Sequence, residues 1–400
     1  MGILTGVTVL DLSRIAAGPS CTQMLADMGA TVWKIERPGA GDDTRRIRPF
    51  LKDDQGRDTL DSAFFLALNR GKQSITIDIA HPDGAALVRD LAAKADIFVE
   101  NYKAGGLSKY GLDYAGISAI NPGIVYCSIT GFGQTGPHAA RPAYDSIMQA
   151  TAGLMSMCGE PDGPPMRTAI NMVDLTTGYV ACVSILAALL HKRGTGQGQS
   201  IDTAMLDAAV ALNAQHAVTW LTLGEIPKRA GNGAPNTFPS GVFPTRDDDM
   251  IVVTANDGQY GALCRVIGRP DLIDDPRYVT NTVRRQNRAD LRAELIKSLV
   301  EKPAAEWAEL LEAAGVASAP INAMDGVFRD PQVIHRQLAL TMAHASGRDV
   351  TVARSPLNFS ATPVEHRAPP LLGAQTEAVL TSVLGCTAER IASLRAAKVI

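Results

Sequence analysis

Paired cysteines, long apolar runs and targeting segments are all missing from this sequence. The 400 residues include 6 cysteines, and none forms a C-x-x-C pair or stands near histidine at the spacing of a zinc site. Scattered cysteines of this kind are typical of buried thiols in a reducing compartment. No apolar run reaches the roughly 20 residues that a membrane-spanning helix needs, and no basic leader precedes the first apolar segment. We therefore expect a cytoplasmic protein with no metal site and no membrane-spanning segment.

Charge of one sign is also scarce. Lys and Arg together number 38 against 41 for Asp and Glu, which gives a net charge of -3, and no block of like charges occurs. Proteins that bind nucleic acids or membrane surfaces need a clustered cationic field. The sequence thus predicts neither as a partner. Hydrophobic residues make up 46% and charged residues 20%, a composition typical of globular domains with a sizeable core.

Several catalytic motifs are absent as well. There is no Walker A loop, no G-x-S-x-G elbow and no H-E-x-x-H helix. Glu36 follows Gly18 at about the spacing of a dinucleotide-binding fingerprint. However, Gly18 is followed by Pro19, and the G-x-G-x-x-G pattern is missing. Because that pattern lets the backbone approach a pyrophosphate, its absence argues against nicotinamide chemistry.

The apolar pattern predicts an α/β fold. Strand-like segments alternate with helical ones and are expected at 7–12, 31–36, 74–79, 96–100 and 124–129. Strands that alternate with helices form a mainly parallel, Rossmann-like sheet covered on both faces. Two long helices are expected next, at about 175–193 and 201–223. A loop rich in Gly, Pro and Asn then marks a change of domain. We expect a large domain in 1–223, a smaller α+β domain in 224–322 and a return to the large domain in 323–400.

A glycine-containing turn with four arginines follows the second expected strand. The arginines are Arg37, Arg45, Arg46 and Arg48. Ligands of parallel sheets bind beyond the carboxyl ends of the strands, and guanidinium groups suit phosphate. A solvated basic loop is the alternative interpretation.

Asp174 stands between a polar loop and a long apolar helix. An aspartate there suits a helix N-cap, because its oxygen accepts the free N–H groups of the first turn. It also suits a nucleophile: a carboxyl with a pKa near 3.9 is ionised at pH 7, and a helix N-terminus would keep it so. Gly231 and Gly233 likewise fit an ordinary turn or a source of N–H groups for an oxyanion.

Motifs along almost the whole chain resemble family III CoA-transferases, the group that contains formyl-CoA transferase and carnitine CoA-transferase. In chain order they lie at 17–19, 34–42, 69–72, 99–102, 128–133, at Asp174 with 177–178, and at 370–373. The resemblance implies a Rossmann-like large domain, a small domain and an interlocked homodimer. It also implies that coenzyme A and its acyl thioesters are substrates, with no permanently bound cofactor.

Site residues follow from the same resemblance. Asp174 matches the aspartate nucleophile, which would carry CoA as an aspartyl-CoA thioester, and Gly231 and Gly233 would meet the oxyanions. The expected CoA-binding set is Ala16, Arg37, Arg70, Lys72, Asn101, Lys109 and Arg141.

One related activity and the choice of substrate need separate arguments. The α-methylacyl-CoA racemases share the fold but carry a histidine before an aspartate, where this chain has Tyr144. A phenol with a pKa near 10 is a poor acid or base at neutral pH, so transfer is favoured over racemisation. An acyl-CoA hydrolase and a non-catalytic CoA-binding protein are further alternatives.

The substrate hypothesis comes from a branch of the family. Ala16 stands where formyl-CoA transferases carry glutamine. Segments 38–45, 126–131, 134–137 and 320–322 resemble the succinate–hydroxymethylglutarate CoA-transferase branch. This resemblance implies small dicarboxylates, with succinyl-CoA as donor. A second carboxylate would need a cation, for which Arg46 and Arg167 are candidates beside Tyr144 in the substrate set. A surface or structural ion-pair role is the more common one for an arginine and is the alternative for both.

Overall fold

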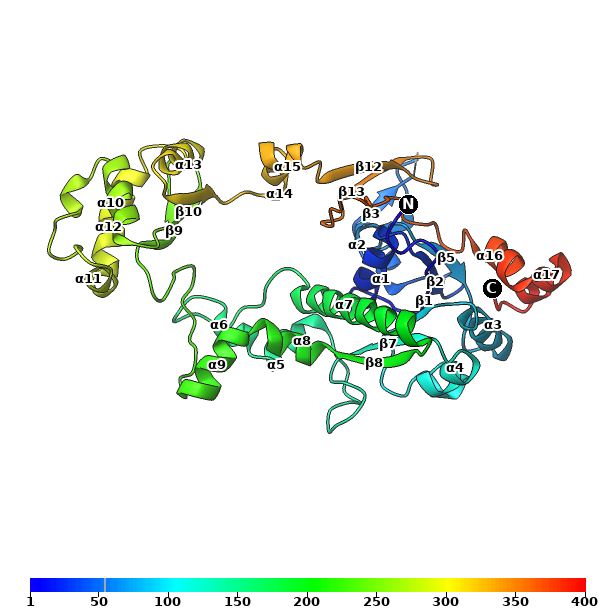
Figure 1. Cartoon of the computed structure of the whole chain (residues 1–400). Coiled ribbons are helices and arrows are strands. Elements are labelled where there is room, and N and C mark those ends of the chain that lie inside the picture. The colour runs from blue at the N-terminus through cyan, green and yellow to red at the C-terminus, as the bar shows by residue number, and fades with distance from the viewer. Residues whose placement is uncertain (54) are drawn as a thin grey trace. The chain divides into compact units, whose positions relative to one another are not determined.

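The computed structural model describes residues 1–53 and 55–400, and these form two compact units. The first unit comprises Met1–Leu154, Arg167–Gly224 and Ile334–Ile400, and the second comprises Met155–Met166 and Glu225–Val333. The second unit therefore takes in residues 155–166 and extends to Val333, beyond the expected range of 224–322. Figure 1 shows the elements of both units and labels most of their helices and strands.

The first unit is built on a six-stranded, wholly parallel sheet in the order β5-β2-β1-β6-β7-β8. Its strands are β1 (Thr8–Asp11), β2 (Thr31–Glu36), β5 (Gln73–Thr76), β6 (Ile97–Glu100), β7 (Val125–Thr130) and β8 (Gln199–Ala204). The predicted mixed α/β fold with a large parallel sheet is confirmed. The central strands are buried on both faces, which explains their nearly continuous apolar sequence.

Helices cover both faces of this sheet. Successive strand residues point to opposite sides, so each face presents apolar side chains that the helices bury. On one face, Val9 packs in a core with α1 (Ala17–Asp27) and α7 (Met172–Thr195). On the other face, Leu10 packs in a second core whose helices include the chain's C-terminal end. These are α3 (Pro82–Ala92), α4 (Tyr114–Ile120), α16 (Thr376–Leu384) and α17 (Ala388–Ala396).

The long apolar helix α7 lies against α1 with very little space between them (Figure 1). A Cβ atom added at Gly178 would lie 2.1 Å from Ser20 Oγ and 2.6 Å from the Ala17 carbonyl oxygen. Glycine is therefore required at this contact. By length and composition alone α7 is apolar enough to cross a membrane, but half of its most apolar window is buried within the protein, as in the core helix of a globular domain.

The predicted helix at about 201–223 is wrong in its first turn and in its continuity. Residues Gln199–Ala204 form β8, which pairs with β7 from Val125↔Gln199 to Thr130↔Ala204. The helical part is broken at Asn213 into α8 (Met205–Leu212) and α9 (Ala214–Leu223). Pairing with the sheet edge outweighs a local pattern that fits a helix equally well.

The second unit has its own core. A three-stranded antiparallel sheet, in the order β11-β10-β9, packs with helices around Tyr260, Tyr278 and Trp307. Its main elements are β9 (Ser240–Pro244), β10 (Asp249–Val253), α10 (Asp257–Val266), α11 (Asn281–Gln286), α12 (Arg288–Leu299), α13 (Ala304–Ala313) and β11 (Ala317–Pro320).

Shorter elements complete the described chain. They are β3 (Phe50–Lys52), β4 (Asp58–Ser62), α2 (Ala63–Leu68), α5 (Asp145–Thr151), α6 (Leu154–Met157), α14 (Met324–Val327), α15 (Pro331–His335), β12 (Ala339–Ala343) and β13 (Asp349–Ala353). Of these, α5 packs against α7 and α8 in the first unit and bears on the site described next.

Candidate active site

The order of the strands creates a crevice beside β1. From β1 the chain winds outward through β2 to β5, and it then returns to the other side of β1 with β6, β7 and β8. The segments that leave β1 and β6 therefore diverge at their carboxyl ends, which is where open α/β sheets bind ligands. Asn101, directly after β6, ties the two segments together: its Oδ1 accepts the Arg14 N–H at 2.8 Å, and its Nδ2 donates to the Arg14 carbonyl oxygen at 2.7 Å.

A pocket of about 250 Å³ occupies this position. Its floor comes from residues 14–17 after β1, 101–104 after β6 and 129–131 at the carboxyl end of β7. Residues 139 and 141–144 form one wall, and Asp174, the carboxylate on the first turn of α7, opens into the same space. The structure thus places Asp174, Ala16, Asn101, Arg141 and Tyr144 of the predicted set around one pocket.

Asp174 is not the cap of its helix. The N-cap position of α7 is Asn171, whose side chain makes no capping bond. Instead, the carboxylate of Asp145, on α5, accepts the backbone N–H groups of Val173 at 2.8 Å and Asp174 at 3.1 Å. Among the described residues, none donates a hydrogen bond to the Asp174 side chain, although only 8% of Asp174 is exposed. The capping interpretation of Asp174 is therefore wrong, and its carboxyl is left available within the pocket.

The protonation of Asp174 also differs from the sequence-based expectation. Burial raises its pKa from 3.8 to about 7, and repulsion from Asp145 adds to the effect. The expectation of an ordinary pKa is wrong. A helix N-terminus stabilises the carboxylate by at most about 2 kcal/mol. Each pKa unit corresponds to about 1.4 kcal/mol, so the helix cannot offset a rise from 3.8 to about 7. The carboxyl is therefore close to titration at neutral pH.

A strained residue stands at the floor of the pocket. Ile15 has a φ of 69°, which is costly for a β-branched residue. Asp42 accepts the Ile15 N–H with one oxygen at 3.3 Å, and its other oxygen pairs with Lys34 Nζ at 2.9 Å. Lys34 also donates to the Ser13 carbonyl oxygen at 2.9 Å. This buried pair fixes the segment that leads into Ala16 and the start of α1.

Arg70 and Lys72 lie away from the pocket. Both are buried, and the guanidinium of Arg70 pairs with Asp27. Lys72 Nζ lies 3.2 Å from Asp11 Oδ2 and also donates to Asn69 Oδ1 and the Pro19 carbonyl oxygen. Their contacts are those of residues that stabilise the fold.

The other predicted cations are more exposed. Arg37 pairs with Asp43 and lines a small cavity that also contains Arg14 and Tyr102. Lys109 lies exposed over the ring of Tyr110. Arg46 and Arg167 are exposed, and neither lines the pocket of Asp174.

Gly231 and Gly233 belong to the second unit. The Gly231 N–H donates to the Gly159 carbonyl oxygen at 3.0 Å, and the Gly233 N–H donates to the Ala230 carbonyl oxygen at 3.1 Å. Both amides are therefore used within the unit in this conformation.

Sequence reasoning missed three neighbours of Asp174. Arg14 and Lys103 line its pocket as cations, and Asp145 holds its helix. Arg14 was identifiable, since it follows the first expected strand on the ligand-binding side of the sheet. Asp145 follows Tyr144 at the position of the aspartate in the racemase pattern, but its contact with α7 was not foreseeable, because its partners lie 28 and 29 residues further along the chain.

Glu36 is unavailable to a dinucleotide ribose. Its carboxylate is buried and accepts bonds from Arg45, Ser74 and the Asp42 N–H. Among the residues described, no group of three or more His, Cys, Asp or Glu side chains could hold a metal ion.

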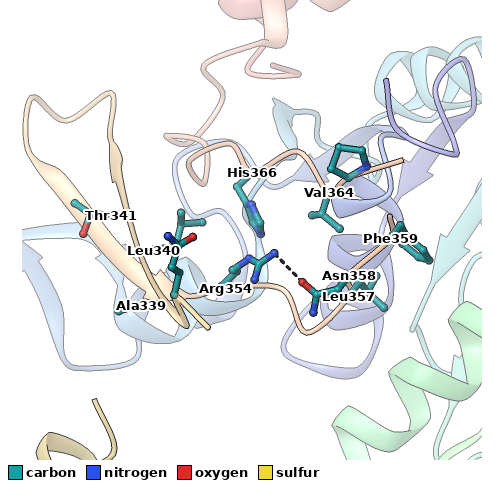
Figure 2. Close-up of a pocket in the computed structure, with 11 residues that line it drawn as sticks. Ala339, Leu340, Thr341, Arg354, Leu357, Asn358, Phe359, Val364 and His366 are labelled. Carbon is teal, nitrogen blue, oxygen red and sulfur yellow. Dashed lines mark hydrogen bonds between the residues drawn. The ribbon is translucent and has the colours of Figure 1, made fainter. Parts of the chain in front are cut away.

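A larger cavity, of about 560 Å³, lies beside β12 and β13. Figure 2 shows its Arg354 side chain bonded to Asn358, near His366. Its 11 lining residues include no carboxylate and no thiol, and no hydroxyl among them is hydrogen-bonded to a base that would activate it as a nucleophile. The smaller pocket at the end of the parallel sheet is therefore the better candidate for chemistry.

Comparisons with known proteins point to one family. A family model described as CoA-transferase family III matches residues 4–376. A succinate–glutarate CoA-transferase of Agrobacterium fabrum is 41% identical over 381 residues, which is 95% of this chain and 95% of that protein. A succinyl-CoA:glutarate CoA-transferase of Homo sapiens is 40% identical over 398 residues, 99% of this chain and 90% of that one. The solved structure of a CaiB/BaiF family protein from Brucella suis has a TM-score of 0.88 at 40% identity, and covers 96% of this chain and 99% of its own.

Proposed function

Because this chain belongs to CoA-transferase family III, we propose that it transfers CoA from succinyl-CoA to a small dicarboxylic acid such as glutarate. The names of the bacterial and human relatives support this pair of acids. The observation that carries the mechanism is Asp174: a buried carboxyl without a hydrogen-bond donor among the described residues, open to the pocket at the end of the parallel sheet.

The chemistry assigned to Asp174 proceeds through four acyl transfers. The carboxylate attacks the thioester carbonyl of succinyl-CoA, and the CoA thiolate leaves a mixed anhydride. The thiolate then attacks the Asp174 carbonyl, which releases succinate and forms an aspartyl-CoA thioester. The acceptor carboxylate attacks this thioester to give a second anhydride and a free thiolate. Finally the thiolate attacks the acceptor's carbonyl, which restores the Asp174 carboxylate and releases the new acyl-CoA.

Two features of the pocket support this sequence of steps. The carboxyl is desolvated, which limits the access of water to an anhydride. Its raised pKa also makes the ionised form a stronger nucleophile than an exposed aspartate.

A dicarboxylic substrate needs a cation in the pocket of Asp174 to bind its second carboxylate. Arg141 and Lys103 both line the pocket, are exposed and make no ion pair within the described chain. Arg141 is the better candidate, because a guanidinium can bind a carboxylate through two parallel hydrogen bonds. Arg14 lines the same pocket but is paired with Asp43. Arg141 therefore replaces Arg46 and Arg167 in the substrate hypothesis.

We also propose a homodimer, as the family resemblance implies. Apolar side chains remain exposed on the first unit along α7 and α9, and these include Tyr179, Val183, Leu190, Trp220 and Leu221. A single chain that left all of them in water would forgo the burial of a large apolar surface. Light scattering that gave the mass of one chain would contradict the dimer.

The deciding experiment supplies the purified protein with succinyl-CoA and a set of mono- and dicarboxylic acids, and identifies each new acyl-CoA by mass spectrometry. We expect glutaryl-CoA to form while the total thioester is conserved. Hydroxylamine or borohydride trapping of the succinyl-CoA-treated enzyme, followed by peptide mass analysis, should place the modification on Asp174. Release of free CoA without a new thioester would instead indicate hydrolysis.

The Asp174→Asn variant is the matched control. It keeps the size of the side chain but removes the nucleophilic carboxylate, so new acyl-CoA and the trapped peptide should both disappear. Transfer at the parent rate by this variant would contradict the mechanism. Exchange of the α-proton of a branched acyl-CoA in deuterated water, without transfer, would favour racemisation.

A further inference from the structure

The residue that holds Asp174 in place is the buried carboxylate of Asp145. Only 8% of Asp145 is exposed, and it stands at the start of α5. One oxygen accepts the N–H groups of Val173 and Asp174, and the other accepts Gln149 Nε2. Both oxygens are thus engaged, and the carboxylate sits at the positive end of the α7 dipole.

This arrangement does two things at once. It supplies α7 with the N-terminal cap that Asn171 does not provide, so the backbone that carries the reacting carboxyl is fixed. It also places a negative charge beside that carboxyl, although a neutral Ser, Thr or Asn would cap a helix equally well. The choice of a charged cap therefore affects the chemistry of Asp174 as well as the helix.

We propose that Asp145 is a positioning residue for the transfer reaction, which orients Asp174 and strengthens it as a nucleophile. The proposal rests on the proposed function, in which Asp174 attacks the thioester. Repulsion between the two carboxylates exists only while Asp174 is free and ionised. It is relieved when Asp174 becomes a neutral anhydride or thioester, so the charge of Asp145 favours acylation over the free carboxylate.

Other charges around the pocket do not replace this effect. Those on the remaining walls are Arg14, Asp43, Tyr102, Lys103, Arg141 and Tyr144. Apart from burial, Asp145 is the neighbour that raises the pKa of Asp174. No ionisable side chain of α1 or α8 lines the pocket, where these helices contribute only Ala17 and Met205.

The test compares the full-length parent with Asp145→Asn, which keeps the shape and an acceptor oxygen but removes the charge. We expect the acid limb of kcat/KM to have its midpoint near pH 7 in the parent and about one pH unit lower in the variant. At pH 8, where both nucleophiles are ionised, kcat should fall about tenfold, with KM within about threefold. An unchanged midpoint in the variant would overturn the proposal.

Asp113→Asn is the matched control. Asp113 also caps a helix from its side chain, by accepting the Gly116 N–H of α4 at 3.1 Å, but it does not line the pocket. Its replacement should leave the midpoint in place. An equal shift in this control would show that loss of any negative charge is sufficient, and would also overturn the proposal.

A second variant and an NMR titration cover the case in which Asp145→Asn does not fold or transfer does not occur. If Asp145→Asn does not fold, Asp145→Ser supplies a short neutral cap with the same expected shift. The carboxyl carbon of Asp174 can also be titrated by NMR in the protein labelled with 13C-aspartate and assigned with Asp174→Asn. That titration midpoint should fall in the neutral Asp145 variant whether or not transfer occurs, so it separates failure of this inference from failure of the proposed function.

Discussion

Two groups of buried charges in the first unit behave in opposite ways. Near β1 and β2 each acid has a basic partner: Asp42 lies 2.9 Å from Lys34, and Glu36 lies 2.7 Å from Arg45. These contacts lower the pKa of Asp42 to about 2 and also lower that of Glu36. At the start of α7, Asp174 is buried beside a second acid, and its pKa rises to about 7.

Burial alone therefore does not decide the charge of these groups. Burial opposes ionisation in both places. Cations outweigh it at Asp42 and Glu36, whereas at Asp174 it is the largest effect and repulsion from Asp145 adds to it. The paired group keeps its charges across the neutral range and holds the segment 13–15 in a strained conformation. The unpaired carboxyl is close to titration at neutral pH, which is the usual property of a reacting group. Within one unit, one group of buried charges thus stabilises the fold, and the other contains the carboxyl that we propose to react.

The largest expected effect is the loss of activity when the carboxyl of Asp174 is removed. Asp174→Asn should lower the rate of acyl-CoA formation at least about 10⁴-fold, because no other carboxylate of the pocket is proposed to accept the acyl group. Steady-state rates with succinyl-CoA and glutarate, read by mass spectrometry, measure the loss. A reduction of less than about tenfold would count against Asp174 as the nucleophile.

Removing a partner from the paired group should reduce stability instead. Lys34→Met leaves Asp42 buried without its cation and should cost about 3–5 kcal/mol in the free energy of unfolding. Urea denaturation of the variant measures the change, with Lys109→Met as an exposed control that should differ from the parent by less than about 0.5 kcal/mol. Equal midpoints for Lys34→Met and the parent would show that the pair does not stabilise the fold.

The pH dependence of stability should have opposite signs at the two places. The pKa of Asp174 is raised on folding, so its protonated form favours the folded state and this contribution is lost as the pH rises toward 7. From pH 5 to pH 8, Asp174→Asn should therefore gain about 2–3 kcal/mol relative to the parent. The paired Asp42 has a lowered pKa, and its contribution should be lost only as the pH falls below about 4.

Urea denaturation midpoints measured at several pH values test the predicted pH dependence of stability at both Asp174 and Asp42. A difference between parent and Asp174→Asn that does not change between pH 5 and 8 would mean that the carboxyl does not titrate in this range.

The smallest expected effect is a change in substrate binding when Arg141, in the wall of the pocket, is replaced. Arg141→Ala should raise the KM for glutarate about 10- to 30-fold while changing the KM for succinyl-CoA less than the KM for glutarate, because a carboxylate would lose a charge-assisted bond. Arg46→Ala, outside the pocket, should alter neither constant by more than about twofold. If the two variants behave alike, the distal carboxylate is bound elsewhere.

Local sequence patterns predicted the architecture well where burial is uniform. The β-branched runs that became β1, β2, β6 and β7 are buried on both faces, and β2 has the expected bounds, Thr31–Glu36. The prediction failed for β8, an edge strand with Gln199, Ser200 and Asp202, because polar residues give no strand pattern and only the pairing with β7 settles its conformation.

The site was only partly predictable for a related reason. The position of Asp174, between a polar loop and an apolar helix, drew attention to it from sequence alone. Its environment depends on burial and on Asp145, which reaches it across 29 residues of chain. Contacts of this kind are set by tertiary packing, so no local pattern contains them.

The hydrogen bonds between Asn101 and Arg14 have a consequence for how this pocket can diverge. They join two segments 87 residues apart and fix the floor at the ends of β1 and β6. In the wall at 141–144, Arg141, Pro142 and Tyr144 are exposed, whereas Ala143 packs against the core around Met148 and Val173. Substitutions at the three exposed wall positions should therefore reshape the pocket while the floor at the ends of β1 and β6 stays in place.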